Sequence, residues 1–177
     1  MGQTYFAIQT RRQELRESAD FQRLSEEGRR LRLRGELSAH NEALGAAAKQ
    51  SGVETSLDYA IFQDHGYRGL YGELDAEGIQ SRKGLKKSQE ILDYMDSTEL
   101  AANLFRATQT EDKLRREGVK DKLEANAAHF EVGRKVRKTI EELGGAMPED
   151  LPTPAKSISQ IEREQKKGIA RDDSGKK

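Results

Sequence analysis

The chain carries as many charged as apolar residues, and this balance restricts its possible folds more than any other sequence feature. Of 177 residues, 35% are charged and 34% hydrophobic, against about 25% and about 45–50% in ordinary globular domains. Aromatic residues make up only 6%, and tryptophan is absent. Long amphipathic helices suit this composition, because each buries one narrow apolar stripe and leaves its other faces in water. We therefore expect an all-α fold.

Apolar residues recur at helical spacing in two central segments. The first opens with the capping signal at residues 97–99 and ends before Gly118, and the second runs from about Lys120 to Leu143, before Gly144. We expect the two helices to form an antiparallel pair. The residues expected to face the core are Leu100, Leu104, Phe105 and Leu114 in the first helix, and Leu123, Ala127, Phe130, Val136, Ile140 and Leu143 in the second.

The remaining sequence predicts shorter or interrupted helices. We expect one helix over residues 3–18, another capped by Asp20 and running to about Gln50, a third from residue 56, and short pieces at 75–83 and 85–95. No strand pattern and no internal repeat stand out. The chain is thus predicted to be an irregular bundle of about five to seven helices.

The C-terminal part should differ from the bundle. All three prolines lie within residues 147–154, which favours an extended segment. We expect a helical domain over residues 1–146, with residues 1–18 as a junction helix. We expect residues 147–165 to hold the extended segment and a short helix, and residues 166–177 to be a disordered, lysine-rich tail.

Several classes of protein find no support in the sequence. Lys plus Arg and Asp plus Glu both number 31, so net charge gives no reason to expect a polyanion as partner. The chain has no cysteine, and no apolar run approaches the about 20 residues of a membrane span. No signal peptide precedes the helices. We expect no membrane association and a cytoplasmic location.

No catalytic or metal-binding motif is recognisable. His40, His65 and His129 lie far apart and lack the spacing of metal ligands, and His129 is typical of a satisfied polar residue at the edge of a core. The glycines of residues 66–72 lack the Gly-Lys-Ser/Thr ending of a phosphate loop. We expect no metal, no cofactor and no enzymatic activity. Paired carboxylates arise on solvated helices by composition alone.

Two kinds of feature are candidates for binding. The three glycines of residues 66–72 disfavour a plain helix. The tyrosines among them either stack on a binding partner or are buried in the core. Four basic clusters either contact phosphates or are the solvated faces of amphipathic helices. The candidates are His65, Tyr67, Arg68 and Tyr71 in the first feature, and Arg82, Lys83, Lys86, Lys87, Arg134, Lys135 and Arg137 in the second.

Five blocks of sequence closely resemble the DNA damage-inducible protein D (DinD) family. Together they cover most of the chain, to about residue 161. The block at 97–111 contains Arg106, which joins the candidate binding residues. The blocks are residues 2–15 (GQTYFAIQTRRQEL), 62–72 (FQDHGYRGLYG), 82–87 (RKGLKK), 97–111 (STELAANLFRATQTE) and 133–137 (GRKVR), the last leading to 147–154 (MPEDLPTP).

This resemblance implies a bacterial or phage protein that is induced in the SOS response and negatively modulates RecA recombinase filaments on DNA. Family members usually carry an N-terminal domain of the BRO type ahead of the first block, so we expect this chain to hold only the C-terminal region. The favoured function is a non-catalytic module that binds the RecA filament. The alternatives are a DNA-binding accessory that uses the basic clusters, possible targets including single-stranded DNA, and an unrecognised enzyme such as a nuclease. Exposed Tyr5 and Phe6 favour a homodimer.

Overall fold

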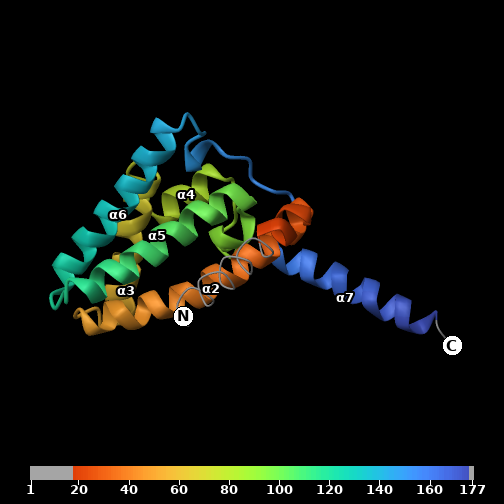
Figure 1. Cartoon of the computed structure of the whole chain (residues 1–177), viewed down its shortest axis with the longest axis horizontal. Coiled ribbons are helices and arrows are strands. Elements are labelled where there is room, and N and C mark those ends of the chain that lie inside the picture. Colours follow the sequence, from red (N-terminus) through yellow and green to blue (C-terminus); the bar gives the residue numbers. More distant parts are fainter. Residues whose placement is uncertain (1–17, 176–177) are drawn as a thin grey trace, which may run out of the picture.

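The computed structural model describes residues 18–175, and no β-strand occurs in that range (Figure 1). The predicted all-α, irregular bundle is confirmed. The expected junction helix and the Tyr5–Phe6 pair fall on residues 1–17, outside the described residues. The helices are α2 (Glu26–Gln50), α3 (Ser56–Leu70), α4 (Ala76–Arg82), the 3-10 helix η1 (Ile91–Tyr94), α5 (Ser97–Arg116), α6 (Lys122–Glu142), the 3-10 helix η2 (Pro148–Asp150) and α7 (Ile158–Ser174).

Each of these α-helices begins at a short polar side chain that accepts a hydrogen bond from its first turn. Thr55 caps α3 and Ser157 caps α7, and in both a side chain three residues later returns a hydrogen bond to the cap. These reciprocal caps satisfy backbone N–H groups that have no partner inside the helix. Ser25, not the expected Asp20, caps α2, because the chain leaves helical geometry at residues 24–25.

Helices α2 and α5 lie side by side and run parallel (Figure 1). At their starts, the Ser97 backbone N–H donates to Glu26 over 2.8 Å, and towards their ends Arg115 reaches the Ala43 carbonyl. Helix α6 returns antiparallel to α5 after a turn at Gly118, whose φ of 58° is left-handed. The predicted antiparallel pair is therefore present, and α5 is the element that joins the two halves of the bundle.

Helices α3 and α6 are held against each other by glycines. A Cβ on Gly133 would lie 2.6 Å from the Gly66 carbonyl oxygen and 2.9 Å from the Leu70 nitrogen, and one on Gly69 would lie 2.9 Å from the Arg134 nitrogen. These separations leave no room for any side chain, so the two backbones touch. The expectation that the glycines of residues 66–72 disfavour a helix is wrong for Gly66 and Gly69, because close packing offsets the about 1 kcal/mol that each costs and α3 continues to Leu70. Gly72 lies beyond the end of α3, with a left-handed φ of 62°.

Residues 147–156, which contain the three prolines, form an ordered strap across the bundle (Figure 1). Buried Arg30 donates to the carbonyl oxygens of Lys156, Met95 and Asp93, which ties the strap to α2 and η1. Because the guanidinium has five N–H donors, one arginine can fix several carbonyls at once. The segment therefore has an extended path with fixed anchors.

Helix α7 projects from the body beyond this strap (Figure 1). Ile158 and Ile161 are buried against the body, whereas residues 162–175 are exposed. The expectation of a disordered tail from residue 166 is wrong for residues 166–174, which continue α7 to Ser174. The reciprocal cap at Ser157 and the absence of proline from the segment allow the helix to extend past its last buried turn.

Candidate partner-binding groove

Tyr67 and Tyr71 are buried, with 7% and 1% of their surfaces exposed. The Tyr67 ring packs edge-on against Tyr71 and beneath the Arg106 guanidinium, which lies 5.0 Å from its centre. Neither ring is presented to a stacking partner. His65 is half-buried beside them, and burial and the charge of Arg68 lower its pKa.

A continuous chain of hydrogen bonds runs through the core beneath α5. Lys83 donates to Glu99 over 2.7 Å, and the Tyr71 hydroxyl donates to the other Glu99 oxygen over 2.6 Å. Asn103 donates to Tyr71 and accepts from the Arg106 guanidinium. Burial raises the pKa of Glu99, an effect that the Lys83 charge opposes. Lys83 and Arg106 therefore hold the core together and are covered by it.

His129 ends this network. Its Nδ1 lies 2.8 Å from the Phe62 carbonyl oxygen, which can only accept, so Nδ1 carries the proton and Nε2 accepts from Arg106. Burial, and then the Arg106 charge, hold the pKa of His129 well below its ordinary value. The ring is neutral and completely enclosed, deeper than the core edge where the sequence placed it.

Two further candidate residues hold the strap. Arg137 makes a two-pronged ion pair with Glu149, with both nitrogen–oxygen distances 2.7 Å, and this hydrogen bonding raises the pKa of the guanidinium. Arg82 donates to the Glu149 carbonyl oxygen and to the Asp150 carboxylate. Both arginines thus join the strap to the bundle.

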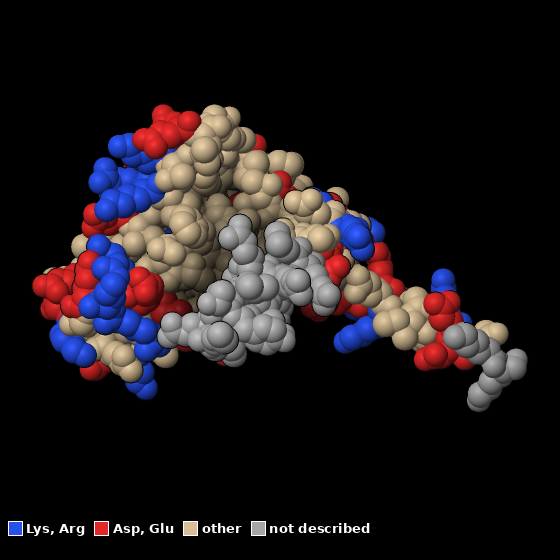
Figure 2. Space-filling view, viewed as in Figure 1, with Lys and Arg blue, Asp and Glu red and all other residues tan. Residues whose placement is uncertain are grey.

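The remaining candidate cations lie on the surface but do not form one patch. Lys86 and Lys87 follow α4, while Arg134 and Lys135 lie on α6, where Lys135 pairs with Glu131 over 3.1 Å. Figure 2 shows acidic and basic side chains interspersed along the α6 edge. Arg68 is exposed and pairs loosely with Asp75 at 3.7 Å.

A groove opens between α5 and α6 on the face that Figure 2 shows as largely uncharged. Its upper part is a cavity of about 290 Å³ between α5, α6 and the strap, and it contains no charged side chain. The small residues Ala101 and Ala102 keep the α5 wall low, and Pro148 of the strap closes one end. An open apolar groove with polar surroundings often marks an interaction site.

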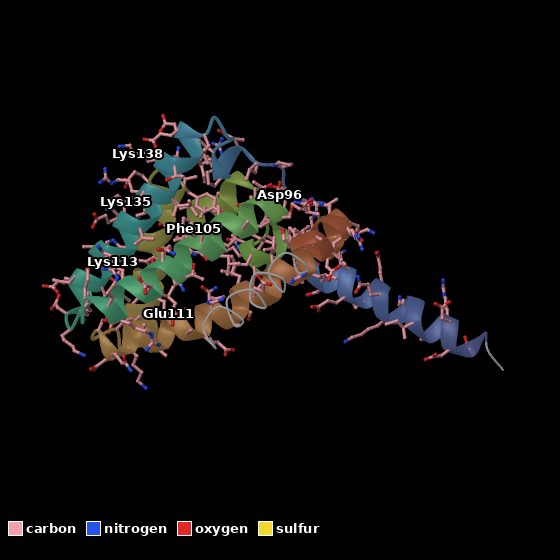
Figure 3. The ribbon with its side chains drawn as sticks, in the orientation of Figure 1. Asp96, Phe105, Glu111, Lys113, Lys135 and Lys138 are labelled. Atoms are coloured by element: carbon pink, nitrogen blue, oxygen red, sulfur yellow. The ribbon has the colours of Figure 1, made fainter. Side chains whose placement is uncertain are left out.

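Phe105 stands in the middle of this groove (Figure 3), and half of its surface is exposed. The sequence placed Phe105 in the core, which is wrong, because Arg106 takes the inward position beside it. The lower part of the groove is a second cavity of about 250 Å³ that shares Phe105, Val136 and Thr139 with the first. The groove therefore continues along α5 past the phenylalanine.

Charged side chains line only the lower part. Lys113, Arg116 and Lys135 are the cations there, and Glu131 is the one carboxylate in that lining. Figure 3 shows Lys113 on α5, the helix that carries Phe105, and Lys135 on α6. The groove is thus uncharged at the strap and cationic toward the Gly118 turn. Of its residues, the sequence named Lys135 as a candidate and included Arg116 in one of the four basic clusters. Phe105 and the alanines carry no signal that separates them from core residues.

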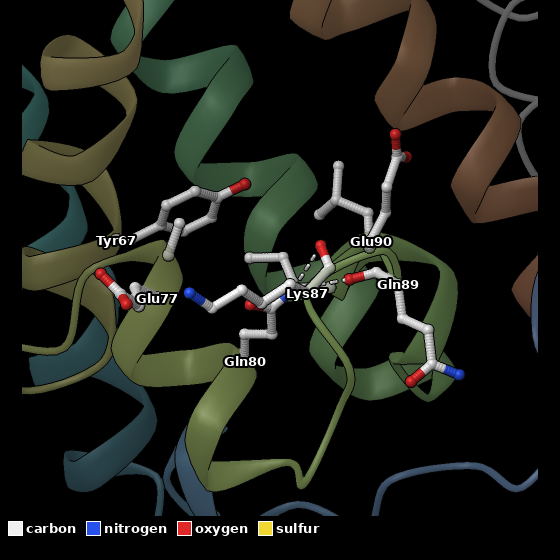
Figure 4. Close-up of a pocket in the computed structure, with 9 residues that line it drawn as sticks. Tyr67, Glu77, Gln80, Lys87, Gln89 and Glu90 are labelled. Atoms are coloured by element: carbon white, nitrogen blue, oxygen red, sulfur yellow. Dashed lines mark hydrogen bonds between the residues drawn. The ribbon is translucent and has the colours of Figure 1, made fainter.

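A second depression lies between α4 and η1 (Figure 4). It measures about 530 Å³, and Lys87 extends across it near Glu77. Its wall is fixed by Gln80, which donates to the carbonyl oxygens of Lys86 and Gln89. Charges of both signs line it, so the depression favours neither an anion nor a cation.

Within residues 18–175, no group of three His, Asp or Glu side chains is placed to hold a metal ion. His129 is enclosed in the core, and neither His65 nor His129 lines the groove or the depression beside α4. Among the described helices, none is both long and apolar enough to cross a membrane.

Comparison with known proteins places the chain. Residues 24–161 match the model of the DinD C-terminal domain family. A curated protein of Escherichia coli (strain K12), DNA damage-inducible protein D, is 66% identical over 161 residues, which cover 91% of this chain and 59% of that protein. The chain therefore spans about three fifths of the length of this relative. No solved structure matches it. On the extent of the family match and this identity, the chain belongs to the DinD C-terminal domain family.

Proposed function

We propose that the chain is a non-catalytic regulatory module of the bacterial DNA-damage response, and that it binds RecA recombinase filaments and negatively modulates them. The name of the curated relative, DNA damage-inducible protein D, supports the damage-response role. The sequence resemblance supplies RecA as the partner. The apolar groove between α5 and α6 supports binding at a surface as the means of action.

The observation that carries the proposal is the exposed Phe105 in an open groove. Half of the Phe105 surface is in water, so covering it with a partner would lower the free energy of the complex. Aromatic anchors of this kind contribute much of the binding energy at protein interfaces. The buried side chains of His129, Glu99 and Tyr71, by contrast, are hydrogen-bonded inside the core. A groove of this kind favours a protein partner over a reaction.

The test adds the purified chain to preformed RecA filaments on single-stranded DNA and follows strand exchange and filament disassembly. The proposal expects slower strand exchange and faster disassembly at increasing concentrations of the chain. Full-length family protein is the positive control. An inactive chain beside an active full-length protein would remove this region as the effector.

The alternative is DNA binding through the basic face of α6. Arg134 favours it, because this exposed residue makes no ion pair within the described part of the chain. DNA binding predicts an affinity that falls steeply with salt, and charge reversal at Arg134 and Lys135 would flatten that slope. Arg137 is a poorer position to reverse, since its charge holds the strap. Binding that is absent, or insensitive to salt, removes this alternative.

A further inference from the structure

We propose that the groove between α5 and α6 is the docking site for an acidic amphipathic helix of a protein partner. The inference rests on the proposed function, in which the chain acts by binding protein, and it names the surface and the chemistry of what binds there. Its basis is the shape of the groove, the exposure of Phe105 and the division of charge along the groove.

The shape fits a helix. From Thr98 to Arg116 the groove follows α5 for about 27 Å, at about 1.5 Å per residue, which is the length of a helix of about 18 residues. Ala101 and Ala102 keep one wall low, so a backbone can approach closely there. Phe105 then stands between successive turns of the incoming helix, as a ridge fits a groove. Recognition of amphipathic helices in apolar grooves has this form.

The uncharged half selects the apolar face of the partner. Phe105, Val136 and Ile140 line it together with the strap residues Pro148 and Leu151. A nucleic acid would gain little there, because its phosphates need cations along the whole path. Apolar side chains spaced three and four residues apart would fill this half and remove Phe105 from water.

The cationic half selects the charge of the partner. Lys113, Arg116 and Lys135 line the lower part with Glu131, and the further carboxylates that pair with Lys113 and Arg116, those of Asp112 and Glu117, lie outside the lining. Their present ion pairs are exposed or partly exposed, so exchanging them for the carboxylates of a partner costs little. A helix whose apolar turns are followed by Asp or Glu therefore matches the groove from end to end.

The N-terminal segment of the chain has the wrong charge for this site. Residues 1–17 contain three arginines and two glutamates, so they carry the same sign as the lower lining. A second copy of α7 is also a poor match, because Lys166 and Lys167 lie at its centre. Charge complementarity thus favours an acidic helix from another protein.

The experiment measures binding of a labelled, helix-forming peptide of about 18 residues, with leucines at i, i+3, i+4 and i+7 and glutamates in its last two turns. Fluorescence anisotropy with the intact chain gives the affinity. We expect Phe105→Ala to weaken binding at least about tenfold. Leu57→Ala is the matched control, since Leu57 is also an exposed apolar residue but lies outside the groove on α3, and it should leave the affinity unchanged.

Charge is tested separately. The double variant Lys113→Gln/Lys135→Gln should weaken binding about threefold to tenfold at low salt, and replacing the glutamates of the peptide by glutamine should have a similar effect. Lys166→Gln/Lys167→Gln on α7 changes the net charge equally and should have no effect. Unchanged circular dichroism and melting temperature show that each variant is folded.

The other outcomes overturn the inference. Equal binding of the peptide by Phe105→Ala and Leu57→Ala would overturn it. Displacement of the bound peptide by a single-stranded oligonucleotide, but not by unlabelled peptide, would also overturn it. Preference for a peptide of residues 2–17 over the acidic peptide would assign the groove to the N-terminal segment of the chain. Failure of the proposed function can be told apart from failure of this inference. A chain that binds the peptide but has no effect on RecA filaments would refute the RecA role and leave the groove assigned as a helix-binding site.

Discussion

At the residue scale, Gly133 shows how strongly one missing side chain can determine packing. Its α-carbon meets the backbone of α3, so a methyl group there must push the two helices apart. We expect Gly133→Ala to lower the free energy of unfolding by about 2–4 kcal/mol, as overpacking against rigid backbone does. Urea denaturation measures the change.

Gly35 provides the matched control for this prediction. A Cβ at that position meets nothing within 4 Å, and the residue lies inside α2. Gly35→Ala should raise the free energy of unfolding by about 0.4–1 kcal/mol, because alanine loses less backbone freedom on folding. Equal effects of the two substitutions would contradict the close contact of α3 and α6.

His129 makes stability depend on pH. Its pKa in the folded chain lies well below 6.5, so as pH falls below about 6.5 the unfolded chain takes up a proton that the folded chain refuses. The free energy of unfolding should therefore fall by at most about 1.4 kcal/mol per pH unit from about pH 6.5 down to the folded pKa. The raised pKa of Glu99 acts in the opposite sense, because the folded chain binds that proton first as pH falls.

Two measurements check this prediction. His129→Gln should reduce the fall in unfolding free energy below about pH 6.5, and the fall that remains includes the contribution of His65, whose pKa is also lowered. In the wild-type chain, the NMR signal of the His129 ring should not titrate between about pH 6.5 and pH 5. A ring signal with a midpoint near pH 6.5 would show that the imidazole is not held neutral in the core.

Neighbouring residues 105 and 106 show where sequence reasoning reaches its limit. Sequence alone placed Phe105 inside, yet Arg106 is the buried side chain and Phe105 is exposed. A helix turns by about 100° per residue, so a shift of one position moves the buried stripe by more than a quarter turn. The choice depends on partners that are distant in sequence, since Arg106 is satisfied only by Asn103, His129 and Tyr67 together.

At the scale of elements, the signals for the two long central helices worked because they are local, whereas the predicted Asp20 cap was wrong. Caps, glycine stops and apolar spacing predicted the α5–α6 hairpin and the all-α class. The continuation of α3 through its glycines was not predictable, because it depends on α6 lying against it. The groove was missed for the same reason: its two walls and its strap come from three separate segments.

The strap is expected to depend on its partly buried ion pair. A double-mutant cycle with Arg137→Gln and Glu149→Gln should give a coupling energy of about 1–3 kcal/mol, because the pair is two-pronged and partly shielded from water. The exposed pair Arg116–Asp112 should give less than about 0.5 kcal/mol in the same experiment. Equal couplings would mean that the strap is not anchored by this contact.

Helix α7 should divide into two parts. Ile161 is buried, so Ile161→Ala should lower the free energy of unfolding by about 2–4 kcal/mol. Ile169 is 65% exposed on the projecting part, and Ile169→Ala should change the free energy of unfolding by less than about 0.5 kcal/mol. Thermal or urea unfolding of both variants checks the division, and a large effect at Ile169 would imply contacts that the projecting half does not make here.

At the scale of the whole molecule, buried charge and exposed apolar surface are separated. Arg106, Glu99 and Lys83 lie inside and neutralise one another in part, whereas Phe105 and the alanines of α5 face outward. A chain with 34% hydrophobic residues gives up core area by exposing any of them. Leu57 and Ile169 are more exposed than Phe105, so it is the apolar groove around Phe105, and not exposure by itself, that favours a partner at this site.

The most direct test of this account measures binding of the intact chain to RecA filaments on single-stranded DNA, with wild type, Phe105→Ala and Leu57→Ala compared at the same salt concentration. We predict that wild type and Leu57→Ala bind equally, and that Phe105→Ala binds at least about tenfold more weakly while melting at the same temperature. Equal binding by all three proteins would contradict the claim that the groove between α5 and α6 is the working surface.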